Sequence, residues 1–148
     1  MSASKKEKID MRFSIKSVDV LNSSYSTPNL PSPIINGFNF DIMLESKLDQ
    51  KNKFILVVAL IKITTNDDAK IQLGEISVGC VYLVENFDEL IKWNGDNKPI
   101  IPDEVVVLLN SISISTTRGV MSQVFKGTFL HNAVLPVLDP KAFAKQNV

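Results

Sequence analysis

The sequence has very few of the side chains on which most enzymes and metal sites depend. It contains one cysteine, Cys80, and one histidine, His131, in 148 residues. A single cysteine cannot form an internal disulfide, and no Cys/His cluster has metal-ligand spacing, so we expect no metal and no other cofactor. Cys80 is in phase with apolar neighbours, as a small core residue would be, and the sequence nominates no nucleophile for His131. We therefore predict that the protein is not an enzyme.

An excess of charge of either sign is also missing. Lys and Arg total 16 and Asp and Glu total 16, so no basic field would attract nucleic acid or anionic lipid. The longest apolar run, residues 54–61, is far shorter than the roughly 20 residues of a membrane-spanning helix. The charged N-terminus, MSASKKEKIDM, lacks the apolar stretch of a secretory signal. We expect a cytoplasmic protein with no nucleic-acid partner and no stable membrane insertion.

The length fits one domain with a core of its own. We expect residues 1–11 to form a flexible tail and residues 12–148 to form this single domain. Apolar residues make up 45% of the chain, which is high for a protein with no membrane span. Part of this apolar surface is therefore expected to face a partner.

Four segments have the patterns of β-strands. Residues 12–20 change apolar phase after Ile15, which predicts an edge strand with a bulge. Residues 38–45 alternate strictly, residues 54–61 are apolar at both parities, and residues 71–84 change phase at Gly74, where we expect another bulge. Short polar turns join the last three strands, so they should pair antiparallel. The Pro-rich residues 22–37 predict a crossover.

Two later segments predict helices. Asn86 and Glu89 have the spacing of a capping box before FDELIKW, a helix that should end at Asn94-Gly95. Residues 102–126 begin with proline and two acids and end with Lys126-Gly127, which favours one long helix despite an alternation of serine and isoleucine.

These elements predict an α+β fold, in which a four-stranded antiparallel sheet carries a long helix on one face. Because residues 54–61 are apolar on both faces, the second face of the sheet needs a cover. Another subunit or the crossover could supply it, and we expect an oligomer.

The stretch GTFLHNAVLPVLDP, residues 127–140, is apolar where loops are usually polar. Its two prolines exclude a regular helix or a central strand. Such a segment is typical of a surface that binds a partner.

Three segments in order resemble the bacterial SecB export-chaperone family. They are SYSTPNLP at 24–31, LGEISVGCVYLV at 73–84 and KGTFLHNAVLPVLDPKAF at 126–143, and the similarity runs from residue 12 to residue 145. The resemblance implies a tetramer that binds unfolded polypeptides or preproteins in apolar grooves without ATP and keeps them translocation-competent. The implied client groove is lined by Tyr25, Leu30, Ile34, Ile35, Phe38, Phe40, Phe129, Leu130, Val134, Leu135, Leu138 and Phe143.

The chain departs from family members that deliver clients to the SecA motor, which have an acidic surface and a zinc-binding tail. Its net charge is zero, and it ends in KAFAKQNV with neither Cys nor His. At the positions that match the motor-contact patch, Leu73 and Glu75 keep the pattern, but Asn22 and Ser26 stand where acids are expected. A SecB-like chaperone dedicated to one antitoxin of a toxin–antitoxin system is therefore a second hypothesis. A small module that binds an apolar ligand in a closed cavity is a third.

Overall fold

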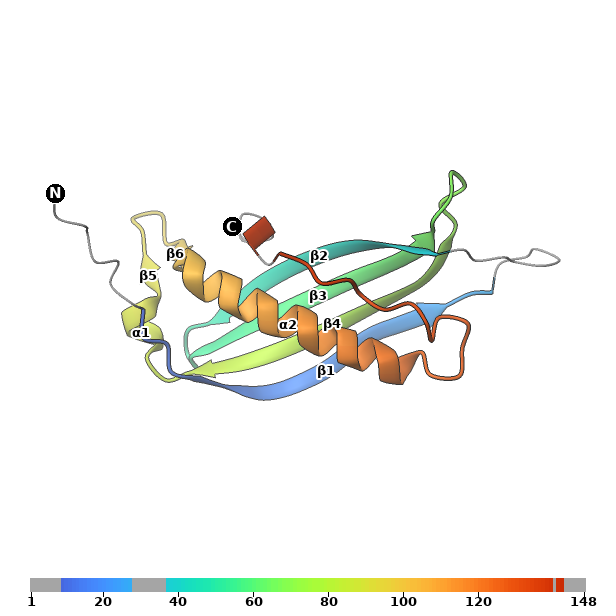
Figure 1. The fold of residues 1–148 in the computed structure, drawn as a ribbon. Coiled ribbons are helices and arrows are strands. Elements are labelled where there is room, and N and C mark those ends of the chain that lie inside the picture. Colours follow the sequence, from blue (N-terminus) through green and yellow to red (C-terminus); the bar gives the residue numbers. More distant parts are fainter. Residues whose placement is uncertain (1–8, 28–36, 140, 143–148) are drawn as a thin grey trace, which may run out of the picture.

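One antiparallel sheet of four long strands organises the protein. The computed structural model describes residues 9–27, 37–139 and 141–142. In spatial order the strands are β1, β4, β3 and β2, so β2 to β4 form a meander and β1 pairs with β4 (Figure 1). The bounds are Phe13–Tyr25 for β1, Phe38–Asp49 for β2, Phe54–Thr65 for β3 and Gln72–Val84 for β4. The predicted four-stranded antiparallel sheet is confirmed.

Bulges occur at both predicted places. The pairing of β1 with β4 shifts between Ile15 and Ser17 and again between Val20 and Asn22. In the β3–β4 ladder, Ile63 pairs with Gly74 and Thr64 with Gln72, which leaves Leu73 as the extra residue. Strand β1 runs five residues beyond the predicted end at Val20, because its serines pair with β4 although they have no apolar alternation.

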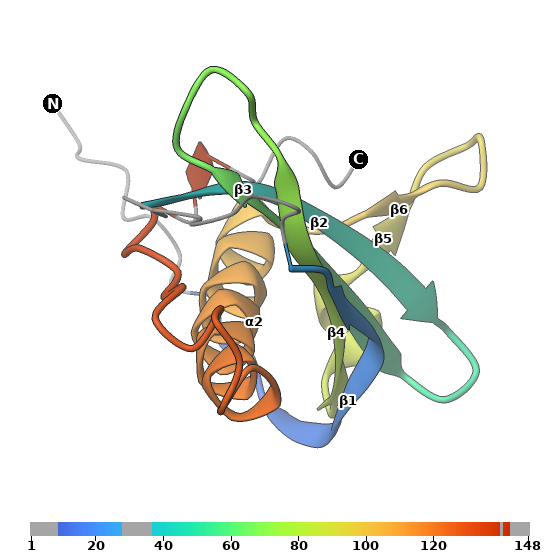
Figure 2. The ribbon, with the colours of Figure 1, turned by 90° about the vertical axis from the view of Figure 1, so that its right-hand side faces the viewer.

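The two faces of the sheet have different surroundings. Along β3, alternate residues from Ile55 to Ile63 are 0–1% exposed and face the long helix α2 (Asp103–Val124), which lies on one side of the sheet (Figure 2). The other parity of β3 is half-buried except for Lys62, and includes Phe54, Leu56, Val58 and Leu60. Within the described residues no element covers this second, outer face, and its expected cover by another subunit or by the crossover stays a prediction.

Helix α2 confirms the predicted long helix. Its buried face explains the alternation of serine and isoleucine, which resembled the pattern of a strand. Asn110, Ser113 and Thr117 are 0% exposed and recur at intervals of three and four residues, which places them on one helical face against the sheet. The hydroxyls of Tyr82 and Ser113 share a hydrogen bond of 2.7 Å, and Thr117 Oγ1 donates to the Ser113 carbonyl. By length and composition alone α2 could cross a membrane, but its apolar residues Val105, Leu109 and Met121 belong to the core.

The predicted helix after Asn86 is wrong beyond Leu90. Helix α1 has only four residues, Phe87–Leu90, and it is followed by a hairpin of β5 (Lys92–Trp93) and β6 (Pro99–Ile100). Asn94 directs this outcome, because its Oδ1 accepts bonds from the backbone N–H groups of Asp96 and Lys98, both at 3.0 Å. A side-chain acceptor of this kind stabilises a tight turn and competes with a helix.

The predicted capping box at Asn86 is also wrong. The Asn86 side chain forms no cap hydrogen bond with α1. Its Oδ1 instead accepts from the backbone N–H of Arg12 at 3.0 Å, and its Nδ2 donates to the carbonyl of Asp10 at 2.6 Å. Ile9 and Met11 pack against the core, so the folded domain begins before residue 12 and the predicted tail boundary at residue 11 lies too far along the chain.

Candidate functional site

The apolar segment after α2 begins with a compact set of turns. Helix α2 ends at Val124, two residues before the predicted end at Lys126, and Gly127 lies in the turns that follow. Its φ of +81° is a left-handed conformation that glycine adopts without strain. Thr128 Oγ1 donates to the Phe125 carbonyl at 2.8 Å and accepts from the backbone N–H of Leu130 at 3.1 Å. The turns bring Phe129 and Leu130 back towards the sheet.

Two of the predicted client contacts are structural anchors of this loop. Leu130 is 1% exposed and Leu135 is 2% exposed, so neither side chain is available to a client in this conformation. Leu130 fits against the bulge in β4, where a Cβ atom at position 74 would lie 2.6 Å from its Cδ1. The absence of a side chain at Gly74 therefore makes the space that holds the loop.

Arg118 fixes the extended segment that follows, residues 133–139. Its Nε donates to the Leu135 carbonyl at 2.8 Å and its Nη2 donates to the Pro136 carbonyl at 2.9 Å. In Figure 1 this segment runs along α2 towards the side of β2. A guanidinium presents several donors in a fixed plane, so one side chain can hold two successive carbonyls.

Replacing Arg118 by Ala is expected to release residues 133–139 from α2, because both carbonyls lose their donor. We expect the melting temperature to fall by a few degrees, since two hydrogen bonds each contribute about 1 kcal/mol. Arg118→Lys, which keeps the charge but cannot donate as a planar fork, should restore less than half of the loss. Differential scanning calorimetry of the three proteins tests this, and equal melting temperatures for wild type and Arg118→Ala would contradict it.

Tyr25 and Phe129 form an exposed aromatic pair beside these anchors. Their ring centroids lie 6.0 Å apart with an interplanar angle of 67°, an edge-to-face contact. Tyr25 is 54% exposed and Phe129 is half-buried. The end of β1 and the loop after α2 thus meet in an apolar contact. Further along the chain, Val134 is exposed and Leu138 is half-buried. We call Tyr25, Phe129, Val134 and Leu138 the loop surface.

The remaining predicted groove residues divide into two groups. Phe38 and Phe40 are half-buried on β2 and pack against the core, on the side of the sheet that α2 covers. Leu30, Ile34, Ile35 and Phe143 lie outside the described residues. Contact of any of these residues with a client stays a prediction.

Sequence reasoning missed Val137, the most exposed large apolar residue of the described chain at 95%. It also missed the apolar residues that β1 leaves exposed, Ile15, Val18, Val20 and Leu21. The apolar character of Val137 was visible in the sequence, but its orientation was not. Pro136 and Val137 are both exposed, so this segment has no regular alternation from which the exposure of Val137 could be predicted.

The two predicted motor-contact residues differ in accessibility. Leu73, in the β4 bulge, is 0% exposed, so it cannot contribute a surface contact in this conformation. Glu75 is half-buried on the outer face, and its Oε1 accepts from Asn22 Nδ2 at 3.2 Å. A motor contact at Glu75 stays a prediction, whereas Leu73 is a core residue.

The described residues offer little catalytic chemistry. Within the three described ranges no group of three or more His, Cys, Asp or Glu side chains could hold a metal ion. Burial raises the pKa of the Cys80 thiol and also that of the Tyr82 hydroxyl, so both stay protonated and unreactive at neutral pH. The side chain of His131 is exposed on the loop.

Comparisons with known proteins identify the fold. No protein-family model matches the sequence, and no curated protein matches it. The structure is similar to Rv1957, a SecB-like chaperone of Mycobacterium tuberculosis in complex with a ChAD peptide from the antitoxin HigA1, Rv1956. The TM-score is 0.56 at 11% identity, over 86% of this chain and 91% of that one. The chain has the SecB-like fold.

A second solved structure, a protein of unknown function from Streptococcus agalactiae, aligns over 88% of this chain and 99% of its own. Its TM-score is 0.32 at 13% identity, too low to assign a fold. The SecB-like assignment therefore depends on the mycobacterial structure, and it agrees with the strand order and the long helix described above.

Proposed function

We propose that this protein is an ATP-independent chaperone that holds apolar segments of unfolded polypeptides. The observation that carries this proposal is the exposed Tyr25–Phe129 pair, held open on a loop whose buried anchors are Leu130 and Leu135. A surface of aromatic and aliphatic side chains binds by apolar burial and recognises no particular sequence. Similarity in fold to a SecB-like chaperone supports the same function.

The strength of one such surface suits a chaperone that must release its client. Burying one large apolar side chain contributes about 1.5–3 kcal/mol. Ordering an extended client offsets much of this gain. One loop surface is therefore expected to bind weakly, and several linked surfaces on one unfolded chain to bind well, because the first contact raises the effective concentration for the next.

The exposed apolar residues support a homo-oligomer, which we propose is a tetramer. Along the edge strand β1, Ile15, Val18, Val20 and Leu21 are 40–56% exposed, and an edge strand has unpaired backbone groups that another chain can complete. Association would bring several loop surfaces into one particle.

Suppression of aggregation tests the proposed function. A chemically denatured client is diluted with and without the purified protein, and light scattering is followed in the absence of ATP. We expect stoichiometric amounts of the tetramer to abolish the rise in scattering. An unchanged rise at several-fold molar excess would refute the proposal, and an equal amount of a folded protein of similar charge is the control.

A dedicated antitoxin chaperone is the second candidate, and two observations favour it over general export. The similar mycobacterial structure holds an antitoxin peptide. The present chain has no net charge and has Asn22 and Ser26 where a SecA-contacting surface is expected to be acidic.

A peptide array of unrelated unfolded proteins and of antitoxin C-terminal segments distinguishes the two functions. One antitoxin segment bound at least 100-fold more tightly than the rest supports dedication, and similar affinities support a general holder. In either case we propose a cytoplasmic location.

A further inference from the structure

The outer face of the sheet, which α2 does not cover, has an uncharged apolar centre. Residues 54–60 of β3 and 77–83 of β4 contain no charged side chain. The half-buried apolar row of β3 on this face is flanked by Leu21, Met43 and Leu83, which are 36–60% exposed. Leu21 belongs to the same face, because a Cβ atom at position 79 would lie 3.3 Å from Leu21 Cδ1 and 3.4 Å from Leu56 Cδ1. A continuous apolar area of this kind marks a surface that binds a partner.

Charges of both signs border this centre on the two edge strands. The strand register places Lys47 of β2 level with Lys16 of β1, and Glu45 of β2 level with Asp19 of β1. Lys16 lies in the β1 bulge, and its Nζ lies 4.2 Å from the centroid of the Phe54 ring, on the outer face. The paired residues of the first row are Lys47, Leu56, Val81 and Ser17, and those of the second row are Glu45, Val58, Gly79 and Asp19. A lysine row and an acid row thus lie next to each other across the sheet.

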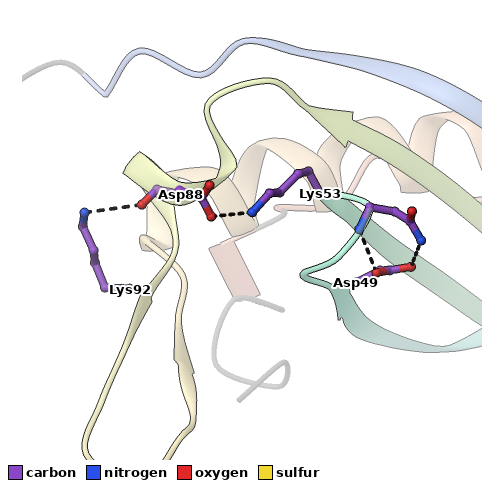
Figure 3. Close-up of polar contacts among 5 residues, drawn as sticks. Asp49, Lys53, Asp88 and Lys92 are labelled. Atoms are coloured by element: carbon purple, nitrogen blue, oxygen red, sulfur yellow. Dashed lines mark hydrogen bonds and ion pairs between the residues drawn. The ribbon is translucent and has the colours of Figure 1, made fainter.

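The charges at the nearby β2–β3 turn are already paired within the chain (Figure 3). Asn52 donates two hydrogen bonds to Asp49, which lower the pKa of that carboxyl group. Lys53 Nζ lies 2.7 Å from Asp88 Oδ1, and Lys92 Nζ donates to the Asp88 carbonyl at 3.5 Å. These groups therefore need no partner from another chain, in contrast to the two charged rows.

We propose that the outer face packs against the outer face of a second copy of this chain. A two-fold axis that crosses the strands midway between the lysine row and the acid row places each row of one copy on the other row of its partner. Lys47 of each copy then lies opposite Glu45 of the other, and Lys16 lies opposite Asp19. In the centre, Leu56 of each copy faces the Val58 row of the other, so apolar side chains meet apolar side chains.

The arrangement of the charges favours a second copy as the occupant. A face that packs on itself needs both signs at positions that a two-fold axis exchanges, because a face of one sign would repel its copy. Within one chain, Lys47 Nζ lies 4.0 Å from Glu45 Oε1, and the side chains are 63% and 64% exposed. An exposed pair at this distance contributes little, so both groups can pair between copies. The solvent side of α2 is less suited, since Leu108 is the only exposed large apolar residue of that fully described helix.

The size of the face predicts a reversible contact. Four strands about 4.8 Å apart, with eight residues along each, cover about 500 Å² per copy. This is less than the roughly 800 Å² that each partner of a stable interface buries. Together with the edge strand β1, a second two-fold contact of this kind would close the proposed tetramer. The loop surface lies on the α2 side of the sheet, so it would stay open to clients.

Charge reversal at the two rows tests the interface. Lys47→Glu places acids opposite each other across the axis, and Glu45→Lys places lysines opposite each other. Each single variant should therefore associate at least about tenfold more weakly than wild type. The double variant Glu45→Lys/Lys47→Glu restores opposite charges and should associate like wild type. Sedimentation velocity over a concentration series, without any client, measures association, and circular dichroism verifies that each variant is folded.

Mixing the two single variants separates a contact between copies from the ion pair within one chain. A Lys47→Glu copy has acids at both positions and a Glu45→Lys copy has lysines at both, so each is complementary only to the other. Native mass spectrometry of the mixture, with one variant isotope-labelled, should show assemblies that contain equal numbers of the two. Wild-type association of either single variant would overturn the inference. A mixture that stays dissociated while the double variant associates would also overturn it, because the charges would then act only within one chain.

These outcomes are distinct from those that test the chaperone function. If residues 28–36 of the same chain or a client cover the outer face instead, neither reversal changes the assembly of the protein alone. That result overturns the interface and leaves the proposed holding of clients intact. Charge-dependent assembly in a protein that fails to suppress aggregation would refute the chaperone function and support the interface.

Discussion

Replacing Phe129 by Asp is expected to lower the affinity for an unfolded client by about 10- to 100-fold. The substitution removes an aromatic contact of about 1.5–3 kcal/mol and places a charge where the client would bury apolar atoms. Phe129 is half-buried, contacts Tyr25 edge to face and packs against the edge of the core, so circular dichroism first verifies that Phe129→Asp is folded. Anisotropy of a labelled, reduced and unfolded client measures the affinity.

Met43→Asp is the control for this experiment. Met43 is an exposed apolar residue on the outer face of β2, away from the loop surface. Met43→Asp should bind the client like wild type. Size-exclusion chromatography of all three proteins separates an effect on association through the outer face from an effect on client binding. Wild-type affinity in Phe129→Asp, with the assembly unchanged, would remove Phe129 from the client-binding surface.

Replacing Gly74 by Val is expected to destabilise the protein by about 1–3 kcal/mol, which corresponds to a drop of several degrees in melting temperature. The new Cβ would lie 2.6 Å from Leu130 Cδ1 and 3.0 Å from the Ser24 carbonyl oxygen. Either Leu130 leaves its site or β1 moves, and both changes loosen the loop that carries Phe129. Thermal unfolding followed by circular dichroism measures the effect.

A double-mutant cycle identifies which contact is responsible. If displacement of Leu130 dominates, adding Leu130→Ala to Gly74→Val should cost much less than it does in the wild-type background. Gly95→Ala is the control, because a Cβ at position 95 meets no atom within 4 Å, and it should leave the melting temperature nearly unchanged. A wild-type melting temperature for Gly74→Val would show that the bulge accommodates a side chain and would contradict the anchoring role of Gly74.

The sequence predicted those elements in which apolar and polar side chains follow a regular pattern. The strands β2 to β4 follow from alternation, and the bulge at Gly74 from a change of phase. For α2, the end signals at Pro102 and Gly127 outweighed the serine–isoleucine alternation. The structure gives the physical reason, since Asn110, Ser113 and Thr117 form a buried polar row with helical spacing. One residue of that row, Ser113, also takes part in the alternation with isoleucine that resembled a strand.

The sequence did not predict features that depend on single polar side chains or on irregular backbone. Asn94 turns the chain into a hairpin where apolar and acidic neighbours favoured a helix. In the segment after α2, the inward positions of Leu130 and Leu135 are set by Gly74 and Arg118, which are distant in sequence. An extended loop has no register of its own, so its apolar residues could be predicted as a set but could not be divided into anchors and exposed contacts.

Site-specific cross-linking tests the central claim most directly. Phe129 is replaced by the photoreactive residue p-benzoylphenylalanine, and the assembled protein is irradiated with a client that is either unfolded or native. The account predicts a covalent adduct with the unfolded client, formed without ATP and absent with the native client. If the unfolded client is captured equally well by the same residue placed at Met43, or is not captured at position 129 at all, the loop surface is not where this protein holds its clients.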